Sequence, residues 1–383
     1  MQISDDYEAG QVISKALTFV TIPENLKDSI LYLDSLFDEV QYIPLATDSS
    51  SIIGQIDKLY FTEDRVIVVD KMKSHAVFVF DRAGSFLHKI DHQGRGPNEY
   101  IEIRDVCFDD DQRLIVLYDD RTDQVFYYSL DGTLVKQHKV GFLFTSFEYH
   151  GDEVFVHTQL DQANPHIPEL YGRELIFTKD NQTLLSSVRQ RYSPYPLMKN
   201  YDPKSEILST YPYFIPTFSD TLFEAKSDPY RLEGSLVIQM PEGPVKPDPT
   251  LTIEEYFDQK KIGSWQKFDG FALRAGNITY VEVRYRSHNF MYTAPAFYHL
   301  ESRELKAGHI VVYRNLPDMD VFEPPRFTDK EWFVSVLEPN RLLEAEERRN
   351  AVGSKELNSN SVKLAELREK ITEFSNPVLM LYK

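Results

Sequence analysis

Residues 56–87 read IDKLYFTEDRVIVVDKMKSHAVFVFDRAGSFL, and residues 104–135 repeat the pattern of this stretch without a gap. In this alignment Asp57 falls on Asp105, Val66 on Leu114, Val77 on Val125, Phe80 on Tyr128, and Gly84 on Gly132. Each copy holds four short apolar runs separated by three polar turns, which predicts four antiparallel strands. A repeated four-stranded unit is typical of a β-propeller blade.

Weaker versions of the same unit continue along the chain. We expect a third blade at Thr145–Val188, a fourth within Tyr211–Ile238, a fifth at Lys267–Val312 and a sixth that includes Trp332–Leu337. The sequence therefore predicts an all-β fold, a six-bladed β-propeller with four-stranded antiparallel blades. Five or seven blades are the alternatives, because loops and insertions blur the period.

A strand from one terminus is expected to close this propeller. Residues 1–39 form an N-terminal extension, and residues 40–383 are predicted to be a single propeller domain. Val40–Leu45 and Val378–Tyr382 are the two candidate strands for closing the ring. One short C-terminal helix is predicted from Ser361 through Phe374, because apolar residues recur there at helical spacing.

Charge and composition limit the classes of partner. The formal net charge is −18, and such an acidic chain repels phosphate backbones and anionic membranes, so no nucleic-acid partner is expected. No apolar run approaches the ~18 residues of a transmembrane segment. Residues 1–11 are polar and do not form a signal peptide. The single cysteine, Cys107, is expected to be a buried small hydrophobe.

The loop GRGPNEY (Gly94–Tyr100) joins the first two repeats and is the first candidate binding site. Two glycines and a proline predict a tight, defined loop. From it Arg95, Glu99 and Tyr100 are expected to project polar tips, on the face where propellers usually bind ligands. The structural alternative is an ion pair of Arg95 with Glu99 that braces neighbouring blades.

Asp57 and Asp105 occupy the same repeat position at the start of the inner strand, and Arg104 lies beside Asp105. Inner strands line the channel of a propeller, so these side chains could form a polar ring. Hard cations such as Ca²⁺ bind several oxygens, which makes calcium the one cofactor worth testing. The alternative is turn capping, or hydrogen bonds to a neighbouring blade. No other metal or cofactor is expected.

Tyr211 and Tyr213 belong to a stretch, Arg191–Phe214, that is rich in tyrosine and proline. A stiff loop lined with aromatic rings could stack on a sugar or a peptide. The alternative is that the rings pack over the edge of a blade. These two tyrosines complete the set of candidate binding residues.

Motifs for catalysis are missing from the sequence. It contains no HExxH pair, no GxSxG nucleophile elbow and no GxxxxGK[ST] phosphate loop. Sialidase-type repeats and WD dipeptides are absent as well. No residue is therefore predicted to be catalytic, and none to bind a metal.

Four segments together resemble one protein family: VQYIPLATDSSSIIGQIDKL (Val40–Leu59), GRGPNEY, FSDTLFE (Phe218–Glu224) and NPVLMLYK (Asn376–Lys383). The resemblance is to the six-bladed β-propeller family of Bacteroidetes-type bacteria, which is distantly similar to NHL-repeat and TolB-like propellers. Its members are usually exported lipoproteins of unknown function. The resemblance thus implies a periplasmic or outer-membrane protein, whose export signal is not part of these residues.

These observations favour a non-enzymatic scaffold of the cell envelope that binds a protein, or a glycan or peptide ligand, on one propeller face. The alternative is a propeller enzyme, either a metal-dependent lactonase-like hydrolase or a glycan lyase or hydrolase, with its site at the central channel. A purely structural role in an assembly is the third hypothesis; a large exposed apolar patch on a blade edge would support it.

Overall fold

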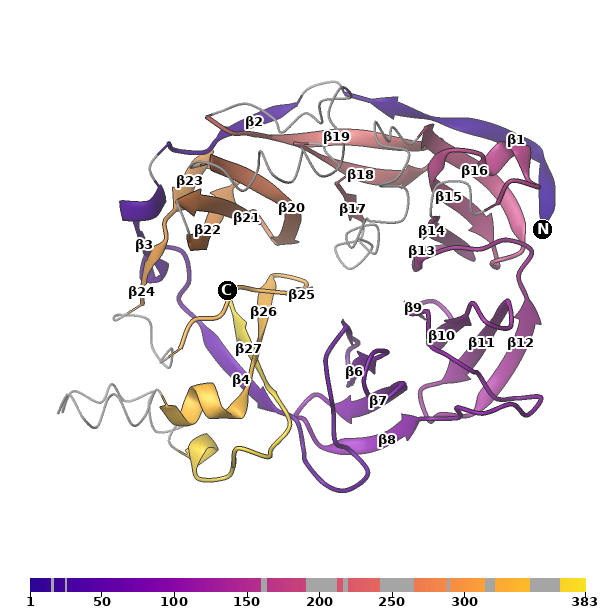
Figure 1. The fold of residues 1–383 in the computed structure, drawn as a ribbon, viewed down its shortest axis with the longest axis horizontal. Coiled ribbons are helices and arrows are strands. Elements are labelled where there is room, and N and C mark those ends of the chain that lie inside the picture. The colour runs from indigo at the N-terminus through magenta and orange to yellow at the C-terminus, as the bar shows by residue number, and fades with distance from the viewer. Residues whose placement is uncertain are drawn as a thin grey trace. The chain divides into compact units, whose positions relative to one another are not determined.

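The computed structural model describes residues 1–14, 17–24, 26–159, 164–190, 212–215, 220–241, 265–287, 290–313, 321–344 and 366–383. The described fold is all-β with few and short helices, as expected (Figure 1). Two compact units make up the chain. Unit 1 consists of Met1–Glu24, His92–Ala272 and Val281–Ala294, and unit 2 of Asn25–Asp91, Leu273–Tyr280 and Pro295–Lys383.

The first repeat folds in unit 2 as a four-stranded antiparallel sheet with sequential strand order. Its strands are β5 (Lys58–Phe61), β6 (Arg65–Asp70), β7 (Ala76–Asp81) and β8 (Phe86–Ile90). β6 and β7 are buried almost throughout, which explains their continuous apolar runs. Gly84 turns the chain between β7 and β8 with a φ of +88°, the left-handed conformation that glycine adopts without strain.

The second repeat forms the corresponding sheet in unit 1. Its strands are β9 (Asp105–Asp109), β10 (Leu114–Asp119), β11 (Gln124–Ser129) and β12 (Leu134–Lys139). Cys107 is buried in β9, and Gly132 has the expected positive φ of 82°. The four-strand reading of both repeats is therefore confirmed.

The gapless alignment fails at one place, the pairing of the second strand with the third. Val66 lies opposite Phe80 in the first sheet, whereas its counterpart Leu114 lies opposite Ser129 and not Tyr128. The third and fourth strands keep the aligned equivalence, since Phe80 lies opposite Phe86 and its counterpart Tyr128 lies opposite Leu134. The cause of the shifted pairing is a longer connection, because five residues separate the paired Asp70 and Ala76, while six separate Tyr118 and Val125. A one-residue slip moves every side chain of the strand to the opposite face.

The rest of unit 1 forms a nine-stranded sheet. It contains β13 (Ser146–Gly151), β14 (Val154–Thr158), β15 (Arg173–Lys179), β16 (Thr183–Gln190), β17 (Tyr213–Phe214), β18 (Thr221–Ser227) and β19 (Tyr230–Gln239). Two N-terminal strands, β1 (Gln2–Ile13) and β2 (Thr18–Thr21), complete it. β1 pairs in parallel first with β16 and then with β19, and so joins two antiparallel groups of strands (Figure 1).

In unit 2 the two ends of the repeat region share one sheet. Its strand order is β25 (Phe327–Asp329), β26 (Trp332–Leu337), β27 (Val378–Tyr382) and β4 (Val40–Pro44). The two strands expected near the ends of the propeller region therefore pair directly, with Val378 opposite Pro44. Pro44 lies on the edge strand of the sheet, as its missing N–H requires.

Two smaller sheets complete the described strands. One has the order β20 (Trp265–Ala275), β21 (Ile278–Ser287), β22 (Phe290–His299) and β23 (Glu304–Ala307), and its residues fall in both units. The other is the parallel pair β3 (Ile30–Tyr32) and β24 (Ile310–Val312). Short 3-10 turns occur at Leu26–Asp28, Leu33–Ser35 and Pro168–Leu170.

The helices of the C-terminal region differ from expectation. Residues 339–344 and 366–368 are helical, and the start of the predicted helix at Ser361 lies outside the described residues. The prediction that this helix continues through Phe374 is wrong, since Phe374 follows the helix and is 82% exposed. The Thr372 N–H donates to Ser375 Oγ (2.9 Å), a local hydrogen bond that competes with helix formation.

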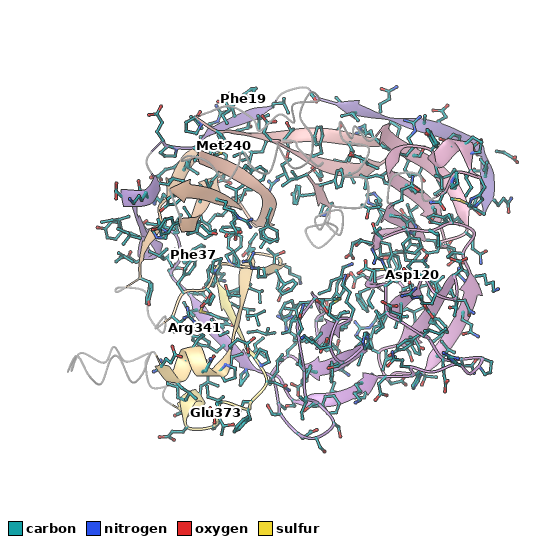
Figure 2. All side chains as sticks on the ribbon, in the orientation of Figure 1. Phe19, Phe37, Asp120, Met240, Arg341 and Glu373 are labelled. Carbon is teal, nitrogen blue, oxygen red and sulfur yellow. The ribbon has the colours of Figure 1, made fainter. Side chains whose placement is uncertain are left out.

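Each unit has its own hydrophobic core. In unit 1, alternate residues of β9–β11 pack on β13–β16, with Tyr118 stacked on Phe144 at a ring-centroid distance of 3.7 Å. In unit 2, Phe37 lies edge-on to Phe297, Phe333 and Tyr382, and is labelled in Figure 2. The aromatic richness of the sequence thus reflects core packing between strands.

One polar residue in the unit 1 core gives a prediction for acid stability. His157 is fully buried among Phe142, Phe144 and Phe147, with its Nε2 at 2.8 Å from Thr178 Oγ1. Burial lowers the pKa of His157 to about 3. In the unfolded chain this histidine takes up a proton near pH 6.5, so its contribution to stability is complete above that pH and is lost as the pH falls.

We therefore expect His157 to account for a loss of about 2 kcal/mol in the free energy of unfolding between pH 7 and pH 5. Urea unfolding at both pH values measures the loss. The variant His157→Gln should show a pH dependence that is shallower by this amount. The matched control is His166→Gln, at an exposed histidine; an equal flattening in both variants would contradict the assignment.

Candidate functional site

The GRGPNEY loop is held by its own backbone and by one carboxylate. Gly94 N–H donates to Tyr100 O (2.9 Å), and Gly96 N–H donates to Glu99 Oε2 (2.7 Å). Arg95 is exposed, as expected. The expectation that Tyr100 projects from the loop is wrong, because its side chain is fully buried and its ring faces Phe126 edge-on. The hydrophobic area of the tyrosine ring determines its position here.

Arg104 lies at the end of the second sheet where β9 begins and β10 ends. We call this end the β9/β10 edge; it comprises Ile101, Glu102, Arg104, Asp105, Asp119, Asp120 and Arg121. Arg104 Nε lies 3.9 Å from Asp120 Oδ2, and Arg121 Nε donates to Glu102 Oε2 (2.8 Å). Figure 2 labels Asp120 in this sheet.

Burial raises the pKa of Asp120, and the Arg104 guanidinium acts against this increase. The charge of Glu102 raises the pKa further. The β9/β10 edge thus presents two arginines and two carboxylates that pair with one another. The Arg121–Glu102 pair is exposed and contributes little to stability, so its charges can be rearranged around a polar partner at small cost, whereas the Arg104–Asp120 pair is partly buried.

Asp105 links two sheets of unit 1. Its side chain is fully buried. Asp105 Oδ2 accepts hydrogen bonds from Ser146 Oγ (2.7 Å) and from Phe147 N–H (2.9 Å), both in β13. The structural alternative for this residue, hydrogen bonds to the neighbouring repeat, is what the structure contains.

Asp57, the repeat partner of Asp105, makes different contacts. Its Oδ2 accepts hydrogen bonds from Lys71 N–H (2.8 Å) and Met72 N–H (3.1 Å), and its Oδ1 accepts one from Gln55 (2.7 Å). Burial raises the pKa of Asp57, and these hydrogen bonds oppose the increase. Asp57 therefore caps the turn after β6. Within the described ranges, no three His, Cys, Asp or Glu side chains are grouped as a metal site.

Two aspartates that the sequence reasoning missed hold the same ends of the sheets. Asp70 ends β6 and Asp119 ends β10, and both are fully buried. Each binds the segment that precedes the first strand of its sheet: Asp70 accepts from Gly54 N–H (2.8 Å), and Asp119 from Ile101 N–H (2.8 Å). The signal was present in the sequence, since RVIVVD and LIVLYD are apolar runs that both end in aspartate.

The structure describes only a small part of the tyrosine-rich stretch. Tyr211 lies outside the described residues, as does most of Arg191–Phe214. Tyr213 is half-buried in β17, opposite Glu224 of β18. Its role as a binding residue stays a prediction.

The described candidates thus divide into two groups by their contacts. Asp57, Asp105 and Glu99 accept hydrogen bonds from backbone N–H groups; Asp57 and Glu99 shape their turns, and Asp105 joins two sheets. Arg95 and Arg104 carry charge at loop and sheet ends. Such an arrangement suits recognition of a polar partner by a preformed loop surface.

A family model described as "Domain of unknown function (DUF4934)" matches residues 17–383. No curated protein matches the chain. Among solved structures, a protein of Bacteroides fragilis, provisionally described as exported, is 14% identical with a TM-score of 0.69. This match covers 96% of our chain and 99% of the other, and it shows a shared fold.

Two further solved structures are more distant. A member of the duf4221 family from Bacteroides vulgatus is 9% identical, with a TM-score of 0.49 over 91% of this chain and 97% of the other. BamB from Moraxella catarrhalis is also 9% identical, with a TM-score of 0.32 over 71% and 76%. Among the residues that the structure describes, no helix has the length and the apolar character needed to cross a membrane.

Proposed function

Since the chain belongs to the family described as "Domain of unknown function (DUF4934)", we propose for it a function that rests on its own geometry. The chain is a non-enzymatic scaffold that binds a protein, or a glycan or peptide, through the loops at one end of its sheets. The GRGPNEY loop and the β9/β10 edge form the centre of this surface.

The scaffold we propose is a six-bladed β-propeller. Its blades would be β5–β8, β9–β12, β13–β16, β17–β19 with the N-terminal strands, β20–β23, and β25–β27 with β4. The sequential antiparallel order of the four-stranded sheets supports this assignment. The pairing of β27 with β4 supports closure of the last blade by both ends of the repeat region.

One observation carries the choice of binding over catalysis. The carboxylates at the candidate positions Asp57 and Asp105 accept hydrogen bonds from backbone N–H groups, and so do the neighbouring Asp70 and Asp119. A carboxylate whose lone pairs accept such hydrogen bonds is less available as a general base or as the ligand of a catalytic ion. A channel enzyme of lactonase or glycan-cleaving type would need such groups to be available.

The proposed location is the cell envelope, where the protein would act as an exported lipoprotein. The shared fold with the Bacteroides fragilis protein supports this location. The net charge of −18 favours a cationic or neutral partner over an anionic surface.

A thermal-melt screen tests the proposal, with peptidoglycan fragments, oligosaccharides, CaCl₂ and EDTA as probes. A ligand present at 100 times its dissociation constant stabilises by about 2.7 kcal/mol, which should raise the melting temperature by a few degrees. We expect one glycan or peptide probe to shift the melt of the wild-type chain. The shift should disappear in the double variant Arg95→Ala/Arg104→Ala.

Arg65→Ala is the matched control, at a half-buried arginine that pairs with its neighbour Asp64. It should leave the ligand-induced shift unchanged. A melt that EDTA lowers and calcium restores, with the effect lost in Asp57→Asn or Asp105→Asn, would support the metal-dependent enzyme instead.

A further inference from the structure

Strand β1 lies between β16 and β19 in the order of the nine-stranded sheet and has no fully buried residue. Every residue from Gln2 to Ile13 is exposed or half-exposed, and Ile3 and Val12 are 40% and 42% exposed. The next strand differs, because Val20 of β2 and Ile22 after it are buried. The N-terminal chain therefore has fully buried apolar side chains only from β2 onward, while along β1 the half-exposed Tyr7 packs against the unit 1 core.

Backbone pairing holds β1 in place. It runs in parallel along β16, with Ile3 opposite Leu184 and Gly10 opposite Val188. It then continues along β19, with Gln11 opposite Arg231 (Figure 1). The register shifts between Ile3 and Glu8, so the pairing with β16 is interrupted. Without β1, the outer edges of β16 and β19 would expose unpaired N–H and C=O groups.

A few specific contacts define which strand fits this edge. Tyr7 Oη lies 2.8 Å from Ser187 Oγ, and Ser186 Oγ donates to Glu8 O (2.7 Å). Gly10 crosses from β16 to β19 at a point with no room for a side chain. A Cβ added there would lie 2.3 Å from Val188 Cγ2 and 2.8 Å from Tyr230 O. The outer edge of β16 and β19 therefore fits a strand that carries a tyrosine three positions before a glycine.

We propose that the outer edge of β16 and β19 is a strand-acceptor site, filled in the isolated chain by its own β1 and able to accept β1 of a second copy. Exchange of an identical strand preserves every contact above, so it costs little beyond bringing two chains together. In one chain the tethered β1 acts at an effective concentration in the millimolar range, so exchange needs high protein concentration or a disabled β1. The inference is independent of the proposed binding loops.

The decisive experiment uses the full-length variant Gly10→Ala, in which the chain's own β1 no longer fits. A fluorescent peptide of residues 1–14 is titrated into it and followed by anisotropy. We expect the peptide to bind this variant at least tenfold more tightly than it binds the wild-type chain. A peptide carrying Gly10→Ala should not bind. Ala9→Ser is the matched control, since Ala9 is exposed, and it should behave as wild type.

Two further measurements test the proposal, one for the case that Gly10→Ala does not fold and one for dimer formation by the wild-type chain. If Gly10→Ala does not fold, a protease site inserted after Ser14 of the wild-type chain allows β1 to be cut free, and the labelled peptide should then replace it. Light scattering should show a dimer fraction that rises with concentration for wild type and Ala9→Ser but not for Gly10→Ala. Failure of the peptide to bind either opened chain, or a wild type that stays monomeric at several hundred micromolar, would overturn the proposal.

Discussion

Replacing Asn376 with alanine should lower the free energy of unfolding by about 3 to 5 kcal/mol. Asn376 is 3% exposed and connects the chain end to the loop before β5. Its Nδ2 donates to Ala46 O and Ser51 O, both at 2.7 Å, and its Oδ1 accepts from Ile53 N–H (2.9 Å). Alanine would leave these three backbone groups buried without their partner.

Urea unfolding at pH 7 measures this effect. Asn376→Asp serves as a second variant, because it keeps the acceptor for Ile53 but sets a carboxylate against two carbonyl oxygens. It should be destabilised at least as strongly as the alanine variant. The matched control is Asn98→Ala at an exposed asparagine, for which we expect a change below about 0.5 kcal/mol. Similar values for Asn376→Ala and Asn98→Ala would refute the role assigned to Asn376.

The second large effect is expected for Asp70→Ala, a loss of about 2 to 4 kcal/mol at pH 7. Asp70 Oδ2 accepts from Gly54 N–H (2.8 Å), Gln55 N–H (3.0 Å) and Ser74 Oγ (2.7 Å), and its Oδ1 accepts from Lys73 N–H (2.9 Å). The side chain therefore ties the loop before β5 to the turn after β6. Its loss would release both segments together.

The pH dependence of this loss is a separate check. Burial on its own raises the pKa of Asp70, but the hydrogen bonds from Ser74, Lys73 and Gly54 outweigh it, so the pKa lies below 3.8. A lowered carboxyl pKa stabilises the fold above the unfolded value and loses this contribution as the pH falls through the folded value. The gap between wild type and Asp70→Ala should therefore narrow below about pH 4. Asp91→Asn, at an exposed aspartate, should show neither effect.

Local patterning was sufficient to predict the strands of the two clear repeats. Apolar runs such as RVIVVD become buried strands, and turns with Gly84 and Gly132 adopt the left-handed conformation that glycine permits. Register was not predictable in the same way. One additional residue between β10 and β11 shifts the register of these two strands by one position relative to β6 and β7, and only the pairing of strands reveals this.

For the candidate residues, the sequence predicted their positions along the chain better than the contacts that their side chains make. Arg95 and Arg104 lie at loop and sheet ends as expected. Tyr100 was misjudged because a tyrosine in a polar loop can still turn its ring into the core. Asp105 was placed correctly at the start of β9, but its partner is β13 of the next sheet, which lies about 40 residues further along the chain.

The sequence by itself determined the all-β class, the four-stranded repeat, the glycine turns and the acidic character of the molecule. These properties depend on residues close together in the chain and on composition, so they can be seen without a fold. Tertiary structure alone decided which aspartates are structural, how Asn376 joins two distant segments, and that a polar N-terminal stretch becomes strand β1 on the edge of β16 and β19. Each of these depends on a backbone N–H or C=O group supplied from far along the chain, and no local pattern encodes such a partner.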